Sequence, residues 1–170
     1  TLVAIFLLLY ANTRSLARAG IVLLAVPYHQ MPQVAKDFGR ALAAKALVFD
    51  ATNPFETRDG EIGAKARQKG AGVAAAEMLP GVKLVRAFNA ISYARMAEAG
   101  KRPASERFGM PMAGDDAKAL ELAATLIREI GYEPVLVGPM KTMGNHLLPG
   151  TALAGERSPE DIRKIAATLK

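Results

Sequence analysis

Two apolar runs with the same kind of ending stand out in the chain. The first covers residues 21–28 and ends at Pro27-Tyr28, and the second covers residues 46–54 and ends at Asn53-Pro54. A strand that is apolar on both faces is typical of a parallel sheet covered by helices. Because proline cannot donate to a sheet ladder, each proline marks the point where a strand has ended. The pattern predicts two adjacent strands whose carboxyl ends border a ligand-binding crevice.

Apolar runs continue to alternate with helical patterns along the rest of the chain. Further strands are predicted at residues 82–88, 108–113 and 134–139. Helices are predicted from Pro32 to about Ala44, over residues 92–99, from Asp115 as N-cap to Gly131, and from Ser158 to the end. The polar segment 55–69 is predicted to be a surface loop that leads to a helix starting at Ile62 or Ala71. This alternation predicts an α/β fold with a Rossmann-like, doubly wound and mainly parallel sheet.

The first eleven residues are apolar, from Thr1 to Ala11. They are too few to cross a bilayer, which takes about 20 residues, and no basic region precedes them as in a signal peptide. We expect a buried strand here, with a damaged or artificial start and a targeting segment as alternatives. A short helix is predicted between residues 11 and 20.

Length and composition are those of one globular domain, predicted to cover residues 1–170 with an atypical start at 1–20 and a tail at 140–170. Cysteine is absent, which excludes a disulfide frame and a thiol nucleophile and is compatible with a cytoplasmic location. The net charge is +6, with Lys and Arg scattered along the chain. Scattered positive charge indicates attraction for an anionic small molecule, or no specific partner, rather than a nucleic-acid surface. We expect neither a nucleic-acid nor a membrane partner.

Amide side chains follow two of the predicted strands. Asn53 and Asn89 can each donate and accept hydrogen bonds, so they suit a flat heteroaromatic ring with its sugar; the alternative is that they only form turns. No acid–base pair accompanies them, which favours chemistry carried by a cofactor. His29 is either a site residue or a surface histidine, and Tyr28 either stacks on a ligand ring or covers apolar surface.

The segments AGIVLLAVPY, ALVFDATNP, GVKLVRAFNAI and MAGDDAKALELAATLIREIGYEPVLVGPM together resemble the NADP oxidoreductases of the coenzyme F420-dependent family. The resemblance implies a Rossmann fold that binds NADP and exchanges hydride with F420, a deazaflavin, or with a flavin, without a dedicated catalytic residue. It also implies two sets of contacts. The NADP ribose and nicotinamide would lie against Val26, Pro27, Tyr28, Asn53 and Pro54, and the hydride-transfer pocket would be lined by Ala87, Phe88, Asn89 and Ala90.

One motif of that family is missing. Such proteins begin with a Gly-x-Gly-x-x-Gly turn that holds the pyrophosphate, and this chain contains none. We therefore expect a fold truncated at its N-terminus relative to the family, and weak or no binding of NADP by the chain as given. Two interpretations remain: an NADP-dependent oxidoreductase with impaired cofactor binding, or a non-catalytic remnant or structural subunit that self-associates, for example as a homodimer.

Overall fold

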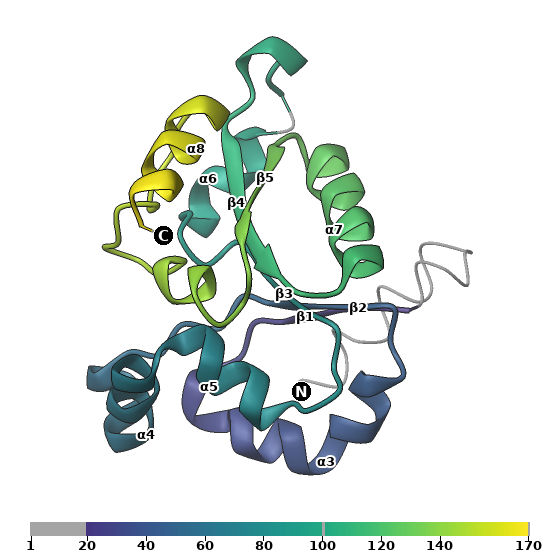
Figure 1. The fold of residues 1–170 in the computed structure, drawn as a ribbon, viewed down its shortest axis with the longest axis vertical. Coiled ribbons are helices and arrows are strands. Elements are labelled where there is room, and N and C mark those ends of the chain that lie inside the picture. Colours follow the sequence, from purple (N-terminus) through teal and green to yellow (C-terminus); the bar gives the residue numbers. More distant parts are fainter. Residues whose placement is uncertain (1–19, 100, 170) are drawn as a thin grey trace.

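A single five-stranded sheet organises the protein. The computed structural model describes residues 20–99 and 101–169. Its sheet has the strand order β1-β2-β3-β4-β5 (Figure 1). The strands are β1 (Ile21–Leu24), β2 (Leu47–Asp50), β3 (Leu84–Arg86), β4 (Gly109–Gly114) and β5 (Glu133–Gly138). All neighbours pair in parallel except β3 and β4, which are antiparallel. The predicted mainly parallel α/β fold is confirmed, with one antiparallel pair that the sequence did not reveal.

The helices connect these strands and cover both faces of the sheet. Those of seven residues or more are α3 (Met31–Ala43), α4 (Glu56–Lys69), α5 (Ala71–Met78), α6 (Tyr93–Ala99), α7 (Ala117–Ile130) and α8 (Pro159–Thr168). Short 3-10 turns are η1 (Tyr28–Gln30), η2 (Ala104–Glu106) and η3 (Met143–His146).

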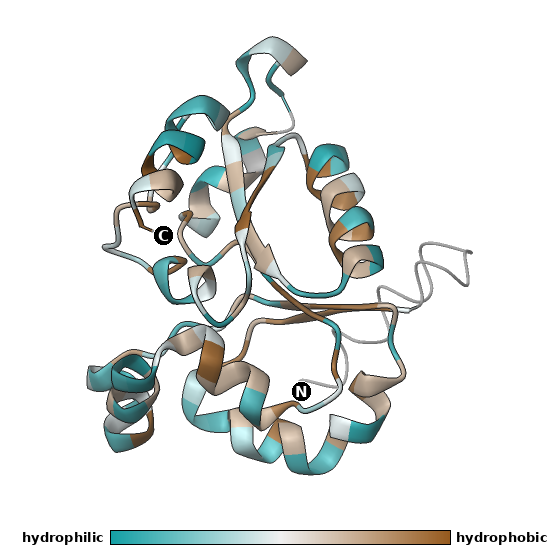
Figure 2. Cartoon of the chain, viewed as in Figure 1, coloured by the Kyte–Doolittle hydropathy of each residue, from teal (hydrophilic) through white to brown (hydrophobic). Residues whose placement is uncertain are grey.

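Alternating side chains of the strands pack into three hydrophobic clusters in the described part of the chain. Val22 and Val48 point to the face covered by α3 and α5, whereas Phe49 and Val85 point to the face covered by α7. Near β4 and β5 the face opposite α7 is covered by α8, whose Ile162 is fully buried. In Figure 2 the strands are largely apolar, and the outer faces of the helices are largely polar. The alternation follows from the two-residue period of a strand covered on both faces.

Segment 55–69 is not the surface loop predicted from the sequence. That prediction was wrong, because the segment forms α4. Two features hid this helix. Its residues are polar on nearly every side, so no apolar stripe marks it, and Gly60 interrupts it with φ 58° and ψ −142°. Glu56 and Asp59 in the first turn and Lys69 in the last turn suit the helix dipole. These charges could have indicated the helix where the apolar pattern did not.

Helix ends agree with prediction in two cases and differ in one. Ser158 caps α8 by accepting a hydrogen bond from the Asp161 amide, and Gly131 ends α7 in the left-handed conformation. The N-cap of α7 is Asp116 and not Asp115, because Asp116 Oδ1 accepts from the Ala119 amide at 2.8 Å. The strands β1, β2 and β3 are also shorter than their apolar runs, whereas β4 and β5 are each displaced by one residue from the predicted ranges.

The β1 strand lies at one edge of the sheet. It pairs with β2, and no second partner strand occurs among residues 20–99 and 101–169. Leu23 in this strand remains 47% exposed. The strand and helix predicted before Gly20 lie outside the described residues. No helix within the described ranges has the length and apolar character needed to span a bilayer.

Candidate functional site

The carboxyl ends of β1, β2 and β3 lie at one edge of the sheet because these strands run in parallel and in register. Segments 26–30, 51–55 and 87–91 follow these ends. The structure brings two of the predicted amide residues into contact, since Asn53 Nδ2 donates to the Asn89 carbonyl oxygen at 3.1 Å. Asn89 Nδ2 in turn donates to the Thr52 carbonyl oxygen at 2.9 Å. The loops after β2 and β3 are therefore joined through their amide side chains.

Both amides keep an acceptor free at this edge. Asn53 Oδ1 and Asn89 Oδ1 are buried, and neither finds a hydrogen-bond donor within the part of the chain that the structure describes. A buried polar atom without a partner costs free energy, about 1–3 kcal/mol, so such atoms occur preferentially where a ligand supplies the partner. Two free carbonyl-type acceptors at neighbouring strand ends can accept from an amide NH2 or from hydroxyl groups.

Phe88, the residue directly before Asn89, has an unusual backbone conformation. Its φ is 70°, the only positive φ of a non-glycine residue among the described ones. A large side chain in the left-handed region carries strain of about 1–3 kcal/mol, which is typical of functional sites. The Phe88 ring contacts Phe49 edge to face, with 5.3 Å between ring centroids. The packing of the ring offsets the strain and fixes the direction in which Asn89 leaves the strand.

The nine predicted site residues differ in how accessible they are. Tyr28 and Ala87 are fully buried, Pro54, Asn89 and Ala90 are buried, and Val26, Pro27, Asn53 and Phe88 are half-buried. The accessible rim of the site is thus formed by the last four. Tyr28 has no exposed surface for stacking on a ligand, so its ring serves as core in this conformation. Burial and the nearby Asp50 carboxylate raise the pKa of Tyr28 to about 12.

A buried ion pair lies beneath this rim, and the sequence patterns did not predict it. Arg86 ends β3 and Asp50 ends β2 at the same register position, and both side chains are fully buried. Arg86 Nη1 donates to Asp50 Oδ2 at 2.5 Å, and Nη2 donates to the Thr52 carbonyl at 2.9 Å. The amide and the hydroxyl of Thr52 donate to Asp50 Oδ1 at 2.9 and 2.6 Å. The sequence did carry a signal for this pair, since Asp50 and Arg86 are opposite charges near the ends of two apolar runs.

A second carboxylate ties the loop after β1 to the loop after β2. The Asp59 side chain has no exposed surface. Its Oδ1 accepts from the backbone amide of His29 at 3.2 Å and from His29 Nδ1 at 2.9 Å, and its Oδ2 accepts from the Phe55 amide at 2.8 Å. Arg58 donates to both oxygens. These bonds, led by that from Arg58, hold the pKa of Asp59 well below its usual range.

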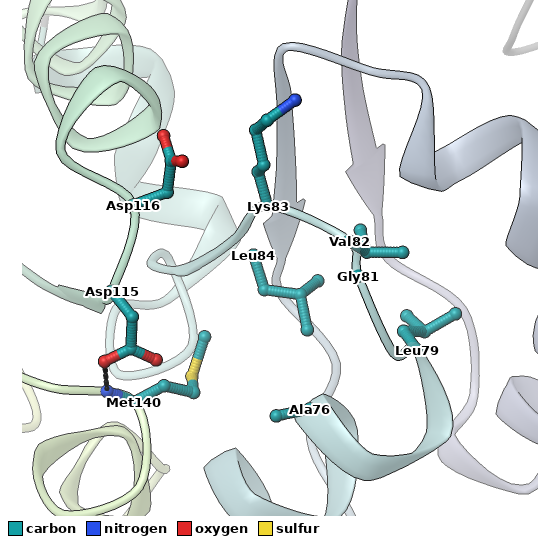
Figure 3. Close-up of a pocket in the computed structure, with 9 residues that line it drawn as sticks. All are labelled: Ala76, Leu79, Gly81, Val82, Lys83, Leu84, Asp115, Asp116 and Met140. Carbon is teal, nitrogen blue, oxygen red and sulfur yellow. Dashed lines mark hydrogen bonds between the residues drawn. The ribbon is translucent and has the colours of Figure 1, made fainter.

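A cavity lies elsewhere on the protein. It measures about 380 Å³ and opens at the start of β3 and at the turn between β4 and α7, opposite the strand ends described above (Figure 3). Its lining combines an apolar floor with Lys83, Asp115 and Asp116. Both acids already have structural partners, since Asp115 Oδ1 accepts from the Met140 amide and Asp116 caps α7. This cavity therefore adds nothing to the candidate site.

The carboxyl ends of β1, β2 and β3 show no metal centre. Within the described ranges, no group of three or more His, Asp or Glu side chains could hold a metal ion. The groups on offer are amide oxygens, backbone atoms, apolar surface and the His29–Asp59 pair. They fit a small organic ligand with hydrogen-bond donors. No acid–base pair was predicted from the sequence, and the structure places the imidazole of His29 at hydrogen-bond distance from the Asp59 carboxylate, 30 positions away.

Comparison with known proteins places the fold. No protein-family model and no curated protein matches the chain. Among solved structures, a hypothetical protein of Sinorhizobium meliloti is similar at 24% identity and TM-score 0.63 over 81% of this chain. A protein of Arthrobacter sp. proposed to be an F420-dependent NADP reductase is similar at 21% identity and TM-score 0.59 over 77% of this chain. A pyrroline-5-carboxylate reductase of Coxiella burnetii reaches only 20% identity and TM-score 0.42 over 69% of this chain and 37% of that one, too low to support a conclusion. The chain spans 65% and 61% of the lengths of the first two. It therefore has a Rossmann-like α/β fold similar to that of an NADP-reductase-like protein.

Proposed function

We propose that the carboxyl ends of β1, β2 and β3, with the segments that follow them, hold the nicotinamide and ribose of NADP(H); we call this region the strand-end edge. We also propose that the protein acts in hydride transfer between NADP(H) and a flavin or the deazaflavin F420. One observation carries the proposal: the buried, unpartnered Oδ1 atoms of Asn53 and Asn89 lie at adjoining strand ends. A nicotinamide carboxamide has two N–H donors and its ribose has hydroxyl donors, which match two such acceptors. The similarity of fold to an NADP-reductase-like protein supports the same assignment.

The residues of this edge would mainly bind and orient. Asn53 and Asn89 would accept hydrogen bonds from the carboxamide or the ribose, and half-buried Val26, Pro27 and Phe88 would cover the ring face and exclude water. The bound nicotinamide supplies the hydride chemistry itself. Holding two reactants in a fixed orientation is the protein's contribution to the rate.

An NADPH fluorescence titration tests this proposal, with NADH and nicotinamide mononucleotide as competitors. We expect weak saturable binding of NADPH, displaced by the mononucleotide because the described edge serves the nicotinamide end. Asn53→Ala and Asn89→Ala should each weaken binding about 3- to 10-fold, the equivalent of one hydrogen bond. Thr125→Ala is the control, because its hydroxyl only donates within α7. Absence of NADPH binding by the folded wild type would refute the proposal.

Self-association is the second candidate, and the edge of β1 favours it. An exposed strand edge invites pairing with another strand, and β1 combines an edge without a described partner with the exposed Leu23. We propose a dimer formed through this edge as the alternative function. Size-exclusion chromatography with light scattering tests it: the wild type should be dimeric and Leu23→Lys more monomeric, whereas a strictly monomeric wild type at high concentration would exclude it.

A further inference from the structure

His29 is the one histidine at the strand-end edge, and the binding role proposed above does not use it. It belongs to η1, directly after Tyr28, where the chain leaves the end of β1. Its side chain is 45% exposed, whereas the side chain of its partner Asp59 is fully buried. A half-exposed imidazole held at one ring nitrogen by a buried carboxylate differs from an ordinary surface histidine, because its orientation is fixed.

The Asp59 contact determines which nitrogen carries the proton. A carboxylate whose pKa is lowered stays ionised at neutral pH and can only accept hydrogen bonds. Nδ1, at 2.9 Å from Asp59 Oδ1, must therefore be the protonated nitrogen. Nε2 has no hydrogen bond to any residue that the structure describes, and it is left to exchange a proton with a ligand. This is the arrangement in which a carboxylate orients a histidine and fixes its tautomer.

The imidazole is connected to the amide pair through a chain of hydrogen bonds. Arg58 Nη2 donates to Asp59 Oδ2 at 2.8 Å and to the Asn53 carbonyl oxygen at 2.7 Å. Asn53 then contacts Asn89. Three consecutive hydrogen bonds thus connect His29 to Asn53, and a fourth connects Asn53 to Asn89. The connection fixes the loop after β1 relative to the loops after β2 and β3.

We propose that His29 is the proton-transfer residue of this site, acting through Nε2 on the hydride acceptor. The inference rests on the proposed function. The hydride from bound NADPH adds to a carbonyl carbon, or to a carbon whose C=C bond is conjugated to a C=N group, as at C5 of a deazaflavin. The displaced π electrons end on the carbonyl oxygen or, through the conjugated system, on the C=N nitrogen. That atom takes the proton from Nε2 of the imidazolium, while Nδ1–H remains bonded to Asp59. The products are NADP⁺ and the reduced acceptor, and water reprotonates the imidazole. The shared chemistry of the acceptor is hydride uptake on carbon with proton uptake on a heteroatom, as in a ketone or a deazaflavin.

The test variant is His29→Asn, because an asparagine amide can occupy the place of Nδ1 and still donate to Asp59, yet it lacks Nε2. His146→Asn is the matched control, since His146 in η3 is the second of only two histidines. NADPH oxidation is followed with FMN, with an 8-hydroxy-5-deazaflavin and with a panel of ketones, in the full chain. NADPH affinity is titrated in parallel, and the His29 tautomer is read from ¹⁵N NMR of the imidazole.

We expect His29→Asn to lower kcat about 100- to 10,000-fold with at least one acceptor that takes up a proton, while NADPH affinity and KM change little. The acceptor with which the wild type oxidises NADPH identifies the acceptor class. The NMR spectrum should show the proton of neutral His29 on Nδ1, and this signal should change in Asp59→Asn. A purely structural histidine would leave kcat intact in His29→Asn, and that result would overturn the inference. A proton on Nε2 in the wild type would overturn it as well, independently of NADPH. Failure of the wild type to bind NADPH would instead refute the proposed function.

Discussion

The buried pair of Asp50 and Arg86 supports the clearest quantitative prediction, through the variant Arg86→Met. Methionine matches the long stem of arginine and removes only the charge and its donors. The Asp50 carboxylate would then stay fully buried with no cation, keeping only the two hydrogen bonds from Thr52. Removing one partner of a buried ion pair costs about 3–5 kcal/mol, because the remaining charge is uncompensated. A domain of this size has a total stability of only about 5–15 kcal/mol.

The double variant Asp50→Asn with Arg86→Met separates the charge effect from lost packing. Asparagine Oδ1 can still accept from the Thr52 amide and hydroxyl, and no charge remains buried. We therefore expect the double variant to be more stable than Arg86→Met alone, so that the two substitutions are far from additive.

Urea unfolding at neutral pH, followed by far-UV circular dichroism, measures both effects because the chain has no tryptophan to report on the core. Arg86→Met should lower the free energy of unfolding by about 3–5 kcal/mol. A loss below about 1 kcal/mol would show that Asp50 is solvated in solution, since surface ion pairs contribute about that much or less. Additive losses in the double variant would equally refute the reasoning. Arg86→Met should also change the environment of the Asn89 side chain, because Arg86 and Asn89 both donate to the Thr52 carbonyl oxygen.

Four further variants test other parts of the structure by the same unfolding assay. Asp59→Asn should destabilise the protein at neutral pH. The fold lowers the pKa of Asp59, so the ionised carboxylate stabilises the folded protein fully above its unfolded pKa of 3.8, and this stabilisation fades as pH falls. The gap to wild type should therefore narrow on acidification, and a constant gap would contradict this. Asp116→Ala should cost about 1 kcal/mol through the lost cap of α7, whereas an unchanged midpoint would exclude the cap. Gly72→Ala should cost about 1–3 kcal/mol by overpacking, because the new Cβ would lie 2.4 Å from the Met140 carbonyl oxygen; full stability would mean that this segment moves freely. Tyr28→Phe should raise stability by up to about 1 kcal/mol, since its buried hydroxyl has no partner among the described residues, and a loss would reveal a hydrogen bond.

Short-range patterns predicted most of the fold. Apolar runs located β1, β2 and β3 near their observed places, and capping residues such as Ser158 and Gly131 marked helix ends correctly. Helix α4 was missed because no apolar face marks it. Phe38 has the same helical spacing as Val34 and Leu42, yet it is 49% exposed, and the buried residues of α3 are Met31 and Leu42.

By itself, the sequence showed where the apolar runs end, and this was enough to single out Asn53 and Asn89, which lie just beyond Asp50 and Arg86, the last residues of β2 and β3. Those positions follow from the apolar runs of strands buried on both faces and, for Asn53, from the exclusion of proline from a ladder. Only the tertiary structure decided which polar groups meet there. The pairs Asp50–Arg86 and His29–Asp59 join residues 36 and 30 positions apart, and such contacts depend on strand register and on the placement of α4. Local propensity carries no information about either. The fold also decided that Tyr28 is core, because the chain after β1 turns inward onto α3 and α4.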